Sequence, residues 1–211
     1  MTSGPLVAVI DYGIGNLRSA QKGLEVAGAD ARLTSDRGLI ADAAAVVLPG
    51  VGAFGACVTA LDSAKLRDIA IEAANDDRPF LGICVGMQLL FEGSDETPGA
   101  PGLGVFPGQV RLLSESVKRP QMQWNLLEIR HESPLLRASD GEAWVYFVHS
   151  YAAETEDEFV LATCDYGGDV TALVGRPGCW ATQFHPEKSA RAGIDVLGRF
   201  VAQAALTAAA R

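Results

Sequence analysis

The chain has 211 residues, of which 48% are hydrophobic and 20% charged, and its formal net charge is −9 at pH 7. These values are typical of ordinary soluble globular proteins with a sizeable core. Lys and Arg form no basic run, so no nucleic-acid partner is expected, and no apolar stretch approaches about 18 residues, so no membrane span is expected. A signal peptide is not indicated either, and we expect a cytoplasmic protein with a single domain over residues 1–211.

Buried strands alternate with helices in the first half of the chain. The apolar runs at residues 6–10 and 43–48, and the run that ends at Cys84, are typical of strands covered on both faces of a parallel sheet. Amphipathic helices are predicted over residues 17–27 and over about residues 57–74. This alternation predicts an α/β fold with a doubly wound, mostly parallel sheet flanked by helices.

Glycine-rich loops follow the first two of these strands. The first, Asp11-Tyr-Gly-Ile-Gly-Asn16, lacks the third glycine of a dinucleotide fingerprint, so we interpret it as a conformationally demanding loop with Asn16 as a helix N-cap. The second, Pro49-Gly-Val-Gly52, could aim a backbone amide at a ligand, but a plain strand-to-helix turn explains it equally well. Ligands bind at the carboxyl ends of the strands in such sheets, where both loops lie.

The second half of the chain contains short strand-like runs separated by Pro and Gly. They predict antiparallel extensions of the sheet, followed by a final strand and an amphipathic helix that uses Ile194, Leu197, Phe200 and Val201. The predicted strands cover residues 109–113, 123–129, 144–148, 159–164, 170–174 and 179–184.

Cysteine usage gives the first indication of chemistry. The four cysteines, Cys57, Cys84, Cys164 and Cys179, are too few for a disulfide scaffold and form no C-x-x-C pair, so no metal site is expected. Three of them are interpreted as packing residues. The exception is Cys84.

Cys84 lies between Gly82 and Gly86 at the point where a strand is expected to turn into a helix. The G-x-C-x-G pattern matches a nucleophile elbow, in which small neighbours allow a strained turn to expose the nucleophile. At a helix N-terminus, free amides and the helix dipole favour the thiolate form. A buried packing residue is the commoner fate of a free cysteine, but the paired glycines favour an exposed and reactive thiol.

A cysteine nucleophile needs a base and a group that orients the base. His131 lies in a polar segment and is expected to be solvated, and His149 follows an apolar strand without an acid nearby in the sequence. His185 is the preferred base because Glu187 follows two residues later, and side chains at i and i+2 share a face in an extended segment. The proline between them favours such an extended path.

Attack on a carbonyl would create an oxyanion that needs hydrogen-bond donors. The amide of Val85, directly after the nucleophile, is the first expected donor, and an amide of Gly50, Val51 or Gly52 is the second. If this glycine-rich loop must rotate to supply its amide, a partner could switch the activity on.

These motifs resemble the class I, triad-type glutamine amidotransferases and, within them, the family of glutaminase subunits of imidazole glycerol phosphate synthase. The elbow and the His-Pro-Glu motif mark the superfamily, whereas the others are more specific to the subunit family. The resemblance spans nearly the whole chain and rests on Asp11-Tyr-Gly-Ile-Gly-Asn16, Pro49-Gly-Val-Gly-Ala-Phe54, Gly82-Ile-Cys-Val-Gly-Met-Gln88, Tyr146-Phe-Val-His-Ser-Tyr151 and Gln183-Phe-His-Pro-Glu-Lys-Ser189.

The resemblance implies glutamine as substrate. It implies that Cys84 attacks the side-chain amide to form a glutamyl thioester, with His185 as acid and base and Glu187 as its orienting partner. Three further positions match family residues at the substrate: Gln88 contacts glutamine, and the backbone of Ser150 and Tyr151 holds its amino acid end.

The resemblance also implies a partner. Ammonia would pass to a cyclase subunit with a (β/α)-barrel fold, in a heterodimer that makes imidazole glycerol phosphate and an aminoimidazole carboxamide ribotide in histidine biosynthesis. Asn16, Trp124, Tyr146 and Lys188 match positions at the partner interface or the ammonia passage. One departure from the family is Gln121-Met-Gln-Trp-Asn125 in place of the usual His-Met-Gly-Trp-Asn, which affects this interface segment and not the triad.

Three other functions remain open from the sequence. The chain could be the glutaminase subunit of another amidotransferase, such as anthranilate or aminodeoxychorismate synthase, but those relatives usually carry histidine where this chain has Met87. It could also be a stand-alone cysteine hydrolase or peptidase, or a non-catalytic binding domain. The complete set of Cys84, His185 and Glu187 disfavours the last of these.

Overall fold

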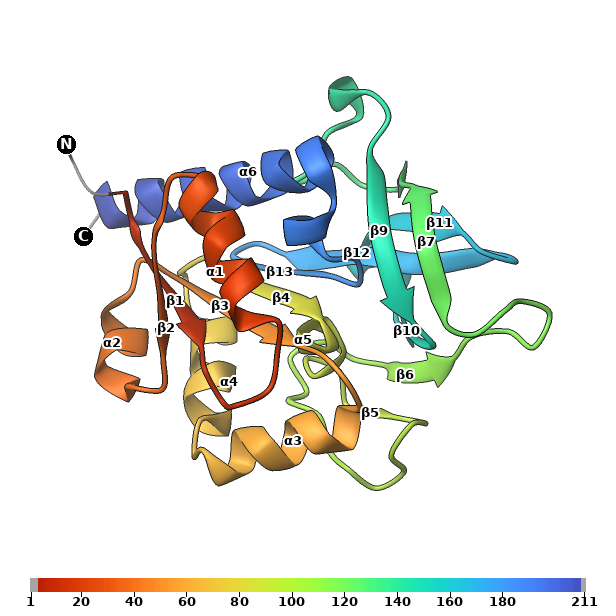
Figure 1. The fold of residues 1–211 in the computed structure, drawn as a ribbon, viewed down its shortest axis with the longest axis horizontal. Helices are drawn as coiled ribbons and strands as arrows, with labels where there is room; N and C mark the ends of the chain where they lie inside the picture. Colours follow the sequence, from red (N-terminus) through yellow and green to blue (C-terminus); the bar gives the residue numbers. More distant parts are fainter. Residues whose placement is uncertain (1–3, 210–211) are drawn as a thin grey trace.

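A central eight-stranded sheet organises the computed structural model, which describes residues 4–209 (Figure 1). Five neighbouring strands run parallel and the last three antiparallel, as the sequence predicted for the fold class. In sheet order the strands are β2 (Asp30–Thr34), β1 (Leu6–Ile10), β3 (Ala45–Gly50), β4 (Phe80–Cys84), β13 (Cys179–Thr182), β12 (Asp169–Arg176), β11 (Val160–Asp165) and β8 (Glu128–Ile129).

Helices cover both faces of the parallel part of the sheet (Figure 1). One face carries α1 (Leu17–Val26) and the long C-terminal α6 (Ala190–Ala209), and the other carries α2 (Arg37–Asp42), α3 (Phe54–Ser63) and α4 (Arg67–Asn75). This two-sided cover explains why β3 and β4 are buried along their whole length and appear in the sequence as uninterrupted apolar runs. Neither β2 nor α2 was predicted.

The single helix predicted over residues 57–74 is wrong, because the chain breaks between α3 and α4. Lys65 adopts a positive φ of 57°, and the amide of Leu66 donates to the carbonyl of Leu61 at 3.1 Å, which closes a helix C-cap. Leu66 is 1% exposed, so the turn also buries an apolar side chain. Asn16 is the N-cap residue of α1, as predicted, but its side chain makes no capping hydrogen bond to the helix.

Two small sheets stand beside the central one. A three-stranded sheet contains β10 (Tyr151–Glu154), β6 (Gln109–Leu112) and β5 (Gly93–Ser94), and a two-stranded ribbon pairs β7 (Gln121–Leu126) with β9 (Trp144–His149). The strand predicted over residues 123–129 is therefore two strands, β7 and β8, which belong to different sheets. Short 3-10 helices form at η1 (Ala138–Asp140), η2 (Asp157–Phe159) and η3 (Pro186–Lys188).

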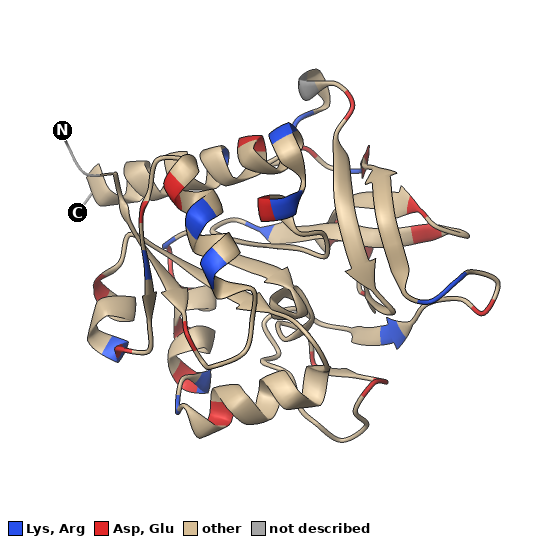
Figure 2. Cartoon of the chain, viewed as in Figure 1, with Lys and Arg blue, Asp and Glu red and all other residues tan. Residues whose placement is uncertain are grey.

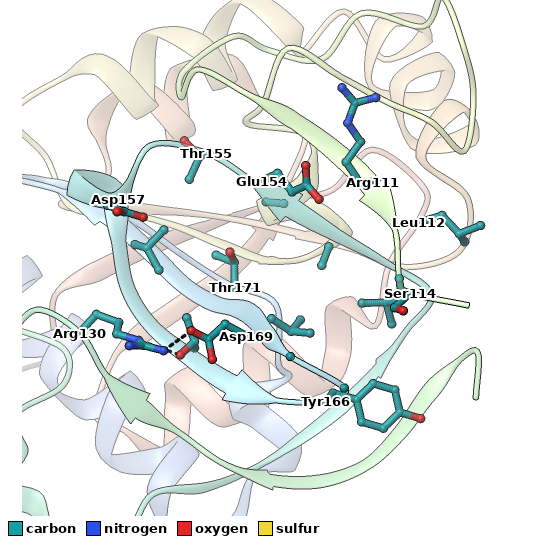
Figure 3. A pocket seen from close by; sticks show the side chains of 18 of the residues that line it. Arg111, Leu112, Ser114, Arg130, Glu154, Thr155, Asp157, Tyr166, Asp169 and Thr171 are labelled. Atoms are coloured by element: carbon teal, nitrogen blue, oxygen red, sulfur yellow. Dashed lines mark hydrogen bonds and ion pairs between the residues drawn. The ribbon is translucent and has the colours of Figure 1, made fainter. Parts of the chain in front are cut away.

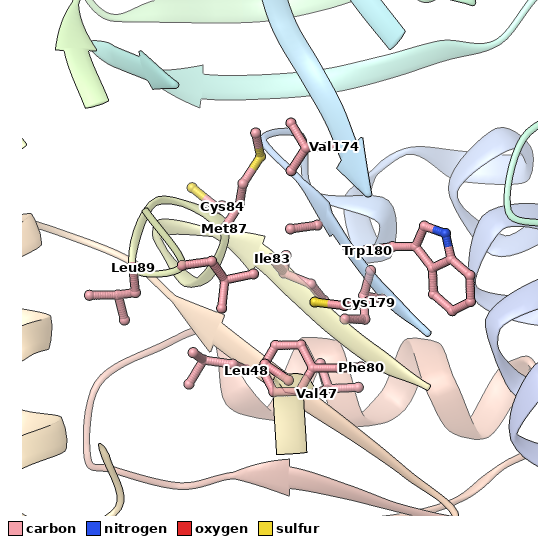
Figure 4. Close-up of a cluster of buried hydrophobic side chains, with 14 of the residues drawn as sticks. Val47, Leu48, Phe80, Ile83, Cys84, Met87, Leu89, Val174, Cys179 and Trp180 are labelled. Atoms are coloured by element: carbon pink, nitrogen blue, oxygen red, sulfur yellow. The ribbon is translucent and has the colours of Figure 1, made fainter. Parts of the chain in front are cut away.

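The core around β3, β4 and β13 supports the end of β4 (Figure 4). Phe80, Leu48 and Trp180 are buried there, and Cys179 lies among them. Burial raises the pKa of the Cys179 thiol to about 12, so this cysteine is an inert packing residue. None of the helices within residues 4–209 has the length and apolar character that crossing a bilayer would require.

Candidate active site

The turn from β4 into α5 (Val85–Gln88) places Cys84 in a strained backbone conformation with φ 56° and ψ −114°. Positive φ is costly for a residue with a side chain and recurs at functional turns. The sequence predicted an exposed thiol, but Cys84 is only 3% exposed. It lies instead in the wall of a cavity of about 410 Å³, which residues 148–151, His185 and Lys188 also line.

Gly86 allows the elbow to pack directly against β3. A Cβ atom at this position would lie 1.8 Å from the carbonyl oxygen of Leu48, a distance no side chain can adopt. We therefore expect Gly86→Ala to lower the free energy of unfolding by about 3 kcal/mol, at the upper end of overpacking costs. Urea unfolding measures this effect, and Gly198→Ala is the matched control because a Cβ there meets no atom within 4 Å. Equal stability of the two variants would contradict the packing role of Gly86.

His185 and Glu187 form a buried hydrogen-bonded pair after the end of β13. The Nδ1 atom of His185 lies 2.8 Å from Oε1 of Glu187, and the two side chains are 2% and 1% exposed. The extended path predicted for this segment is wrong, because residues 186–188 form η3, and Pro186 opens this 3-10 turn. The turn is closed by the amide of Lys188, which donates to the carbonyl of His185 at 3.0 Å.

The environment of His185 favours its protonated form. Burial alone lowers the pKa of a histidine, but hydrogen bonds to Cys84 and Glu187, together with the charges of these two groups, outweigh burial and raise the pKa of His185 to about 9. Glu187 is held in turn by Asn16, whose Nδ2 donates to Oε1 at 3.3 Å. The three groups Cys84, His185 and Glu187 are thus connected in the order that cysteine catalysis requires.

The glycine-rich loop after β3 lies beside the elbow. Gly50 pairs with Cys84 in the sheet, and Val51 and Gly52 line the same cavity as the cysteine. Two side chains hold the loop: the hydroxyl of Tyr12 donates to the carbonyl of Pro49 at 2.8 Å, and Cys57 Sγ lies 3.3 Å from the carbonyl oxygen of Val51. The structure therefore places Val85, Val51 and Gly52 at the cavity wall, whereas Gly50 lies in β3 beside it.

The other end of the cavity carries the residues expected to hold the substrate. Gln88 Nε2 donates to the carbonyl of Tyr151 at 2.9 Å, and Gln88, Ser150 and Tyr151 all line the cavity. Glu96, which sequence reasoning missed, lines it too and accepts a 2.7 Å hydrogen bond from the amide of Phe54 at the start of α3. Its loop shows no periodicity or motif, so only the fold reveals its position.

The remaining histidines have different environments. His149 lines the cavity, but burial lowers its pKa to about 4, so it is a neutral imidazole whose Nδ1 donates to the carbonyl of Tyr151 at 2.9 Å. His131 is exposed and lines a larger cavity of about 680 Å³ beside β6, β10 and β12 (Figure 3). Its two arginines are paired, Arg130 with Asp169 and Arg111 with Asp95, and no cysteine lines it.

Two of the four predicted interface residues, Trp124 and Tyr146, lie side by side. Trp124 is 45% exposed, and its ring centroid lies 6.2 Å from that of Tyr146 across the β7–β9 ribbon. Lys188 is exposed and lines the Cys84 cavity. Asn16 contacts Glu187, the residue before Lys188. Among the side chains that the structure describes, no cluster of His, Cys, Asp or Glu is arranged to hold a metal ion.

Fold and site define the class of protein. The family model described as glutamine amidotransferase class-I matches residues 8–204, so the chain belongs to this family. Two solved structures share the fold at 20% identity: a glutamine amidotransferase with a TM-score of 0.73, which covers 94% of this chain and 98% of its own, and PurLQS from Thermotoga maritima with a TM-score of 0.72, which covers 98% and 99%.

Curated relatives identify a narrower family within the class I glutamine amidotransferases. Imidazole glycerol phosphate synthase subunit HisH of Methanothermobacter thermautotrophicus is 47% identical over 93% of this chain and 98% of its own length. The protein of the same name from Synechococcus elongatus is 46% identical over 97% and 96%, and that from Deinococcus radiodurans is 44% identical over 94% of both chains. The chain is thus a member of the HisH family of imidazole glycerol phosphate synthase subunits.

Proposed function

We propose that this chain is the glutaminase subunit of imidazole glycerol phosphate synthase and hydrolyses glutamine to glutamate and ammonia. The observation that carries the proposal is the connected set of Cys84, His185 and Glu187, of which Cys84 and His185 line one cavity. A stand-alone peptidase would need an open cleft for an extended chain, whereas Cys84 is only 3% exposed and lines a cavity of about 410 Å³, which suits a single amino acid.

The geometry supports a thioester mechanism. The sulfur of Cys84, as thiolate, attacks the side-chain carbonyl carbon of glutamine, and the oxygen takes up negative charge beside the amide of Val85 and an amide of residues 50–52. His185, protonated because its pKa is raised to about 9, gives its proton to the departing nitrogen, which leaves as ammonia. His185 then removes a proton from water, which attacks the glutamyl thioester, and glutamate leaves as the thiolate is restored.

The cavity provides groups for both charges of the amino acid. The carboxylate of Glu96 suits the α-ammonium group of glutamine, because an ammonium ion offers only hydrogen-bond donors. Backbone amides of the segment that contains Ser150 and Tyr151 suit the α-carboxylate. These contacts would orient the side-chain amide toward Cys84.

The β7–β9 ribbon supports docking of a cyclase subunit. Residues alternate along the two paired strands, so one face points to the core, where Phe147 and Val145 are fully buried. The opposite face carries Met122, Trp124 and Trp144, which are 62%, 45% and 49% exposed. Figure 2 shows that neither strand carries a charged residue. An exposed apolar and aromatic patch of this kind is typical of a protein interface.

Gln123, which replaces the usual family glycine, does not belong to this apolar face. It pairs with Phe147 in the ribbon, and its Nε2 donates to Oδ1 of Asn125 at 2.7 Å. The side chain is therefore held along its own strand. We expect docking to tolerate this substitution.

The partner is proposed to be a (β/α)-barrel cyclase that forms a cytoplasmic heterodimer with this chain and uses its ammonia in histidine biosynthesis. We expect the chain alone to hydrolyse glutamine slowly, because hydrogen bonds hold the loop at residues 49–52, which supplies part of the oxyanion site. With the cyclase and its ribotide substrate the loop should rotate to supply its amide, and the rate should be at least tenfold higher. Ammonia release measures the difference.

A surface variant separates docking from catalysis. Trp124→Asp places a charge in the apolar face and should remove the activation while leaving the slow rate of the isolated chain unchanged. Leu206→Asp is the control, because Leu206 is 65% exposed on α6, away from the ribbon. Equal rates with and without the cyclase would contradict the partner-dependent function and favour a stand-alone hydrolase.

A further inference from the structure

Gln183 is a fully buried amide side chain beside the nucleophile. It follows the last residue of β13 and is 0% exposed. A primary amide at such a site costs free energy unless its polar atoms find partners. Both partners of its side chain belong to the candidate active site: Gln88 on one side and Cys84 on the other.

The direction of these hydrogen bonds follows from the chemistry of the groups. The carbonyl of Tyr151 can only accept, so the atom of Gln88 that lies 2.9 Å from it is the amide nitrogen. The same nitrogen lies 3.0 Å from the side chain of Gln183, which must therefore present its oxygen to Gln88. This fixes the nitrogen of Gln183 on the side of Cys84, 3.9 Å from Sγ.

We propose that Gln183 is a positioning residue that donates a hydrogen bond to the sulfur of Cys84 and ties this sulfur, through Gln88, to the amino acid end of the cavity. The hydrogen bond favours the thiolate over the thiol, because a donor interacts more strongly with a charged acceptor. His185 alone would hold the sulfur from one side. Gln183 adds a second fixed contact, so the sulfur is oriented before glutamine binds.

The inference deepens the proposed function and rests on Cys84 as the nucleophile. Its test is the rate at which iodoacetamide alkylates Cys84 in the isolated chain between pH 5 and 10, because alkylation reports the thiolate without glutamine turnover. Mass spectrometry assigns the modified cysteine. Cys57, Cys164 and Cys179 should react slowly, since burial raises the pKa of each of these thiols.

Two variants and a control distinguish a positioning role from a structural one. Gln183→Met keeps the volume but removes the donor, and we expect alkylation at pH 7 to slow at least tenfold and its pH profile to move upward. Gln183→Glu keeps an acceptor for Gln88 but turns an oxygen toward the sulfur, and it should react more slowly still. Gln21→Met is the control, because Gln21 donates to the carbonyl of Ala31 on the edge strand β2, three strands away from β4.

An unchanged alkylation rate and pH profile in Gln183→Met would overturn the proposal, even if turnover fell. If that variant does not fold, Gln183→Glu decides in the same way. A different result would contradict the proposed function: the wild-type chain would still hydrolyse glutamine after alkylation of Cys84.

Discussion

Cys84→Ala is expected to abolish glutamine hydrolysis, with a fall of at least about 10⁴-fold in kcat, because loss of a nucleophile removes the covalent route and leaves only binding and the oxyanion site. The fold should persist, since alanine fills most of the cysteine's volume within the same backbone. The complex with the cyclase should still form product from added ammonium, because that reaction bypasses the thioester. Ammonia release from glutamine and cyclase turnover with ammonium chloride measure the two activities separately.

A buried cysteine outside the site provides the control for this experiment. Cys179→Ala removes a thiol that lies 1% exposed at the opposite end of the neighbouring strand and should cost only about 1 kcal/mol of stability. Its glutaminase activity should equal that of the wild type. Retained glutamine hydrolysis by Cys84→Ala, at more than a few percent, would rule out Cys84 as the nucleophile.

The parts of the fold that the sequence predicted are those governed by local patterns. The strands at residues 6–10 and 80–84 are buried on both faces, so their apolar runs are unambiguous. The helix break at Lys65 was not predicted, because its signal is the burial of Leu66 in the tertiary structure. β2 was not predicted because it is an edge strand, in which polar residues alternate with apolar ones and no apolar run forms.

The candidate site also contains residues that the sequence predicted and residues that it did not. Cys84 and His185 stand in motifs whose residue types and spacing indicate chemistry, and the structure places them in one cavity. Glu96 and Gln183 were not identified as site residues, because their roles depend on contacts with residues 42 and 99 positions away in the chain. The burial of the Cys84 thiol was also not predicted, since the residues that line the cavity with it come from distant parts of the chain.

The raised pKa of His185 makes a specific prediction about pH. A histidine with an ordinary pKa of 6.5 and a folded-state pKa of about 9 stabilises the fold fully below about pH 6.5, and this stabilisation is lost as the pH rises through 9. The same protonation is needed for the departing ammonia, so kcat/KM for glutamine should fall above about pH 9. Stability and activity should therefore decline over the same alkaline range.

Glu187→Gln tests the source of this pKa. The variant keeps the shape and can still accept from Nδ1 of His185, but it removes the negative charge 2.8 Å away, so the fall in kcat/KM should move down by at least about one pH unit, or 1.36 kcal/mol. Glutaminase activity at neutral pH should drop between about 10²-fold and 10⁴-fold, as expected when the orienting acid of a triad is neutralised. Glu25→Gln, on the surface of α1, should change neither quantity.

The shape of the pH profile decides between two roles for Glu187. If its charge holds the imidazolium in place, the variant loses activity and its alkaline limb moves to lower pH together. Glu187 packs closely against α1, since a Cβ atom added at Gly23 would lie 3.2 Å from the Cβ of Glu187. If Glu187 only fills this space, the isosteric variant keeps both the glutaminase rate and the pH at which kcat/KM falls. A large loss of activity without a change in the pH at which kcat/KM falls would contradict the electrostatic role of Glu187. The raised pKa of His185 would then be assigned to Cys84, the other group that hydrogen-bonds His185.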